Sequence, residues 1–122
     1  MRIVAITIFA LELALLFVHE MDAIRRQEWK MFIILKDMED DKAYHIFLLL
    51  HIPLYIVILL LVFFSFSQIA YYVVDAFVIA HMLIHLGFRK HPANKFDNTV
   101  SKTIINLAGI LAVIHPIAAL AE

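Results

Sequence analysis

Long apolar stretches separated by short polar ones dominate the pattern along the chain. The first apolar stretch covers about residues 3–19 with Glu12 inside it, and three more cover about 43–64, 69–88 and 102–121. A helix needs about 20 mostly apolar residues to cross a bilayer. The pattern therefore predicts an all-α protein, a four-helix transmembrane bundle.

The polar segment that follows the first predicted span ends in a short apolar stretch at 31–35. Five residues are too few to cross a membrane. The preceding Trp29 and the arginines at 25 and 26 are residue types that favour the headgroup level. We therefore expect an interfacial amphipathic segment after the first helix.

Composition narrows the class of protein. Of the 122 residues, 64% are hydrophobic and 17% are charged, whereas soluble domains have about 45–50% apolar and about 25% charged residues. This argues against a soluble enzyme and predicts a single integral membrane domain over residues 1–122. The chain has no cysteine, which excludes disulfides, thiolate zinc sites and iron–sulfur clusters. Its net charge of −1 gives no reason to expect nucleic acid as a partner.

The basic residues predict an orientation in the membrane. Nine of the ten lysines and arginines lie in the first and third polar segments, and only Arg2 lies elsewhere. The nine are Arg25, Arg26, Lys30, Lys36, Lys42, Arg89, Lys90, Lys95 and Lys102. Cytoplasmic loops carry the excess of Lys and Arg. We expect these two loops in the cytoplasm, both termini outside, and a bacterial inner membrane as the location.

Several ionisable side chains fall inside the predicted spans. Such residues are costly in the hydrocarbon, so they face the bundle interior or a water-filled cavity. Counted from the cytoplasmic ends at about 1.5 Å per residue, Glu12 and His81 lie about 10 Å deep and His51 about 12 Å deep. Asp75 and His115 lie deeper, at similar levels, and we expect them to pair.

Helical spacing selects the residues that share a face. Positions 12, 19 and 22 lie on one side of the first helix, and 81 and 85 are one turn apart. The predicted metal ligands are Glu12, His19, Asp22, His51, His81 and His85. Imidazoles and carboxylates suit zinc or iron, and helix bundles build such sites from inward side chains.

Other roles for these histidines stay open. They are also suited to hydrogen bonds between helices, and His51 with His81 would serve as axial ligands of haem b. In an enzyme, metal-activated water would attack a lipid-like substrate, with Glu12 or Asp22 as the catalytic general base. The alternatives are a non-catalytic small subunit of a larger membrane complex, a homo-oligomer, or a proton pathway through Glu12, Asp75 and His115.

A short motif links the chain to a known type of protein. The segment His-Glu-Met-Asp-Ala at 19–23, followed by Glu-Trp at 28–29, resembles small bacterial integral membrane proteins with an H-x-x-E-E or H-E-x-D-A signature. Residues 51–53, the histidines at 81 and 85, and residues 94–96 fit the same type. Asp22 and Ala23 stand where the first signature has two acidic residues. The resemblance implies a short helical membrane protein and no particular reaction.

Overall fold

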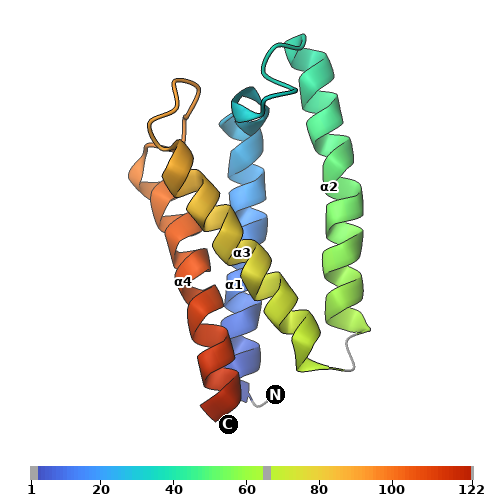
Figure 1. Cartoon of the computed structure of the whole chain (residues 1–122), viewed down its shortest axis with the longest axis vertical. Helices are drawn as coiled ribbons and strands as arrows, with labels where there is room; N and C mark the ends of the chain where they lie inside the picture. The colour runs from blue at the N-terminus through green and yellow to red at the C-terminus, as the bar shows by residue number, and fades with distance from the viewer. Residues whose placement is uncertain (1–2, 65–66, 122) are drawn as a thin grey trace.

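Four long helices account for most of the chain in the computed structural model, which describes residues 3–64 and 67–121 (Figure 1). In chain order the elements are α1 (Ile3–Arg25), the 3-10 helix η1 (Glu28–Met31), α2 (Asp40–Phe63), α3 (Gln68–Phe88) and α4 (Thr99–Ala121). All four α-helices are long and apolar enough to span a membrane. The predicted all-helical, four-span architecture is therefore confirmed.

All four helices extend beyond the apolar stretches that predicted them. α1 continues to Arg25, six residues past the apolar stretch that ends at 19, and α2 and α4 each begin three residues before theirs, at Asp40 and Thr99. α3 begins one residue before its stretch, at Gln68. The helices have 21–24 residues, which at about 1.5 Å per residue gives about 32–36 Å. They are thus slightly longer than the hydrocarbon core of a bilayer, about 30 Å thick.

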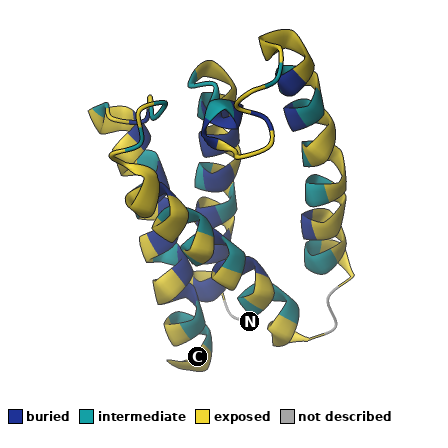
Figure 2. Cartoon of the chain, turned by 45° about the horizontal axis from the view of Figure 1, so that its top comes forward, coloured by how far each residue is buried: buried dark blue, intermediate teal, exposed yellow. Residues whose placement is uncertain are grey.

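The helices α1, α3 and α4 form the packed part of the bundle, and α2 stands to one side (Figure 1). α2 contributes only Ala43, Phe47 and Ile58 to the buried residues. Figure 2 shows buried residues gathered where α1, α3 and α4 meet. Small residues allow this approach, because Ala108, Gly109 and Ala112 of α4 are all buried.

The connection between α1 and α2 starts with a reversal at Gln27. Its backbone is left-handed, with φ 53° and ψ 51°, a conformation that an α-helix cannot continue through. η1 follows, and the Trp29 indole Nε1 donates a hydrogen bond to Asp40 Oδ1 at 3.0 Å. The expected interfacial segment at 31–35 is amphipathic, since Met31 and Leu35 are buried while the residues between them are exposed.

Both long polar connections lie at one end of the bundle. α1 begins and α4 ends at the opposite end, where α2 also ends and α3 begins (Figure 1). This arrangement agrees with an even number of spans and with chain ends on one side. Arg2, used in the orientation argument, lies outside the described residues.

Candidate metal site

Three histidines and one glutamate meet inside the bundle near its polar-loop end. His19 comes from α1, Glu28 from η1, and His81 and His85 from α3. One ligand atom of each lies within 4.8 Å of the ligand atoms of the others. The group therefore joins three separate elements at one point.

The spacing within this group is close to that of a metal coordination shell. His19 Nε2 is 3.0 Å from His81 Nε2. Glu28 Oε1 is 3.1 Å from His85 Nε2 and 3.8 Å from His81 Nε2. Ligand atoms bound tetrahedrally to zinc at 2.0–2.1 Å are about 3.3 Å from one another. The three shortest contacts bracket this value, and the other donor atoms of the group lie within 4.8 Å of one another.

The backbone explains how these side chains come together. His81 and His85 are one helical turn apart, so their rings project from the same face of α3 and stack with centroids 5.1 Å apart. Glu28 is nine residues after His19, which in an unbroken helix would place it about 13 Å further along the axis. The left-handed turn at Gln27 ends α1 and lets η1 return Glu28 to the cluster.

A second carboxylate and a fourth histidine lie beside the cluster. His51 Nδ1 is 2.6 Å from the Phe47 carbonyl oxygen, and because a carbonyl only accepts, Nδ1 carries a proton. His51 Nε2 is 2.8 Å from Glu20 Oε2. A hydrogen bond between these two atoms requires a second proton, carried by the imidazole or by the carboxyl group. The other Glu20 oxygen, Oε1, is 4.0 Å from His81 Nε2.

Two buried polar atoms around the cluster have no hydrogen-bond partner among the described residues. They are His19 Nδ1 and Glu20 Oε1. A buried polar atom without a partner is destabilising, by about 1–3 kcal/mol. Glu20 Oε1 points to the region between Glu20 and His81, where positive charge would compensate it.

Glu28 lies in η1, outside the spanning helices, and its surroundings determine whether its carboxyl is ionised at neutral pH. Burial raises the pKa of its carboxyl, but the hydrogen bond from His85 and the neighbouring histidines 81 and 19 act in the opposite direction and prevail. The pKa of Glu28 therefore lies below its ordinary value. Its carboxylate stays ionised at neutral pH and is available as a ligand.

A second buried cluster lies deeper in the bundle. It consists of Glu12, Asp75 and His115, with ligand atoms within 4.8 Å of one another. His115 Nδ1 lies 3.0 Å and 2.9 Å from the two Asp75 oxygens, which confirms the expected pairing. Glu12 is fully buried, and no hydrogen-bond donor among the described residues reaches either of its oxygens.

Comparison with known protein families gives one match. A family model described as a family of unknown function (DUF6713) matches residues 5–122, which is nearly the whole chain. The chain belongs to the DUF6713 family. Comparison of this DUF6713 protein with curated proteins and with solved structures yields no match.

The structure of this DUF6713 protein distributes the predicted ligands over three places. His19, His81 and His85 come together, and His51 lies next to them through Glu20. Glu12 lies in the deeper cluster instead. Asp22 is engaged elsewhere: it accepts hydrogen bonds from Ser101 Oγ and, at 3.2 Å, from Arg26 Nε.

Sequence reasoning did not name Glu28 or Glu20 as site residues in this DUF6713 protein. Helical periodicity gave no reason to bring Glu28 back to His19, because the reversal at Gln27 breaks the period. The available signal was the motif itself, in which Glu28 and Trp29 follow the His-Glu pair at a short distance.

Proposed function

We propose that the protein is an intramembrane metal-binding protein that holds a zinc or iron ion through His19, Glu28, His81 and His85. The observation that carries this proposal is the convergence of four donor atoms, from three elements, to within 4.8 Å. Nitrogen and oxygen donors without thiolate suit both metals.

Charge balance supports a divalent ion. Three neutral imidazoles and the Glu28 carboxylate leave one positive charge of such an ion uncompensated. Glu20, with Oε1 4.0 Å from His81 Nε2, supplies a second negative charge at short range when metal binding releases the proton of its contact with His51. A neutral assembly is favourable because an unbalanced charge in a low-dielectric interior is costly.

The Glu20–His51 pair is the group best placed for proton transfer. A bound metal ion would supply an acidified water, which is the chemistry expected of an enzyme acting on a lipid-like substrate. Glu20 contacts the cluster, and His51 contacts Glu20 at 2.8 Å. We therefore assign the general-base role to Glu20, in place of Glu12 and Asp22. Haem b is less well supported, since His51 Nε2 is directed at Glu20.

Elemental analysis of the purified full-length protein tests the metal proposal. We expect about one zinc or iron ion per chain, and its loss in His81→Ala and Glu28→Ala. The matched control is His45→Ala, because the His45 side chain is 61% exposed and faces Asp41 away from the cluster. Circular dichroism checks that each variant is helical. Wild-type protein that retains no stoichiometric metal after exposure to zinc and iron would overturn the proposal.

A further inference from the structure

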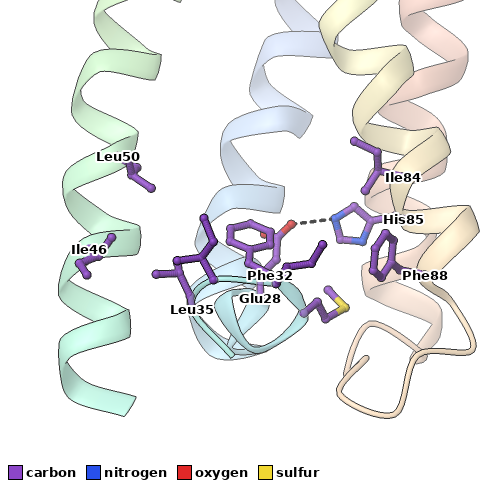
Figure 3. A pocket seen from close by; sticks show the side chains of 11 residues that line it. Glu28, Phe32, Leu35, Ile46, Leu50, Ile84, His85 and Phe88 are labelled. Carbon is purple, nitrogen blue, oxygen red and sulfur yellow. Dashed lines mark hydrogen bonds and ion pairs between the residues drawn. The ribbon is translucent and has the colours of Figure 1, made fainter. Parts of the chain in front are cut away.

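An apolar pocket adjoins the candidate metal site. It has a volume of about 510 Å³ and lies between α2, α3 and the segment after α1 (Figure 3). This is within the range of small-molecule sites, about 300–1,000 Å³. Among the described residues that line it, Glu28 and His85 are polar and the rest are apolar, including Phe32, Leu50 and Ile84.

The polar end of the pocket is part of the metal cluster. Glu28 and His85, which contribute to the wall, are also two of the four proposed ligands, and they contact each other at 3.1 Å. Figure 3 shows this pair facing the apolar side chains that α2 contributes from the opposite wall. A molecule in the pocket therefore has hydrocarbon surroundings along its length and metal ligands at one end.

The polar and apolar ends of the pocket are oriented like the head and the chain of an amphiphile in a membrane. Glu28 belongs to the connection outside the spanning helices, whereas Leu50 is ten residues into α2, about 15 Å from the start of that helix. Leu50 and Ile84 are 55% and 58% exposed on candidate spans. The pocket thus borders the surface that a bilayer would cover, and apolar molecules are concentrated there.

We propose that this pocket binds a single-chain amphiphile with a carboxylate head, such as a fatty acid. This inference rests on the proposed metal site. The chain lies among Phe32, Leu50 and Ile84, and the head lies beside Glu28 and His85 as an additional oxygen ligand of the metal. A carboxylate is a hard oxygen donor of the kind that zinc and iron accept, and a single chain matches a pocket walled by one face of α2 and one of α3.

Photo-crosslinking tests this inference. The probe is palmitic acid with a diazirine on its chain, added to zinc-loaded full-length protein in nanodiscs. We expect crosslinks to concentrate in residues 28–35, 46–50 and 84–88, and excess palmitate to suppress them. Leu50→Trp should lower labelling about tenfold, since the larger indole would project from the pocket wall into the space of the chain. Leu49→Trp is the matched control, because Leu49 is exposed on the same helix and does not line the pocket.

Metal analysis of the same samples separates the two proposals. Protein that binds zinc but is labelled evenly along its outer surface retains the metal site and overturns the amphiphile site. Removal of zinc with a chelator should reduce labelling. If labelling is confined to the pocket and is equal with and without zinc, the head is not bound to metal and the inference is overturned. Protein that binds no zinc overturns both proposals.

Discussion

The Nε2 atoms of His19 and His81 lie 3.0 Å apart, although 62 residues separate them in the chain. A neutral imidazole has one N–H and one lone pair. Two Nε2 atoms at this distance therefore either share one proton or direct both lone pairs at a common cation. The contact joins α1 to α3, so either arrangement also stabilises the bundle.

Acid should weaken the metal-free protein partly through Glu28. The pKa of this carboxyl is lower in the folded protein than its ordinary value of 4.5. Ionised Glu28 thus stabilises the fold above pH 4.5, and this stabilisation is lost as the pH falls through the lower folded pKa. We expect Glu28→Gln to flatten the acid limb of the melting temperature against pH, measured in a chelator. An acid limb identical to wild type would contradict this.

The Glu20–His51 contact should be strongly coupled. His51→Leu leaves a buried carboxylate without its partner and should destabilise the protein by about 3 kcal/mol. His51→Leu combined with Glu20→Met should recover much of this loss, because no buried charge is then left uncompensated. A double-mutant cycle of detergent unfolding measures the coupling. Additive effects would show that the contact seen at 2.8 Å is energetically unimportant.

The two glycines should respond in opposite directions to alanine. A Cβ at Gly109 would clash with the Met82 side chain, including its Cβ at 2.9 Å, whereas nothing lies within 4 Å of a Cβ at Gly87. We expect Gly109→Ala to destabilise by about 1–3 kcal/mol and Gly87→Ala to stabilise by up to about 1 kcal/mol through helix propensity. Thermal melts check both. Partial recovery of Gly109→Ala by Met82→Ala, which removes Sδ and Cε but keeps Cβ, would identify the clash as the cause.

The deeper cluster should tolerate the loss of one carboxylate. Glu12→Gln supplies an amide donor next to Asp75 and should raise stability by about 1–2 kcal/mol. His115→Leu removes the partner of Asp75 at 2.9 Å and should lower stability by a similar amount. Melting temperatures of the two variants provide the test. A lower melting temperature for Glu12→Gln would instead indicate that a cation occupies the cluster.

The sequence was sufficient to predict the architecture and part of the site. Four apolar stretches predicted four spans because each helix in a membrane must satisfy its own backbone hydrogen bonds. Helical spacing predicted that His81 and His85 share a face, and equal depth predicted the contact of Asp75 with His115.

The predicted depth of Glu12 in the membrane was wrong because it was counted from the end of an apolar stretch and not from the end of the helix. Glu12 was placed level with His81 by counting from residue 19, but α1 continues to Arg25. Glu12 is therefore 13 residues from the end of its helix, as Asp75 is from Phe88, and both lie about 20 Å deep. The polar residues after 19 continue the helix without continuing the apolar stretch, so a depth counted from the end of that stretch was too small.

The placement of Glu28 on η1 has a consequence for how the protein matures. Insertion of the four helices delivers three imidazoles to the cluster, but the carboxylate arrives only when the connecting segment folds back at Gln27. An inserted but incompletely folded chain would thus have an incomplete ligand set. Ion capture would then act as a checkpoint for tertiary assembly, distinct from membrane integration.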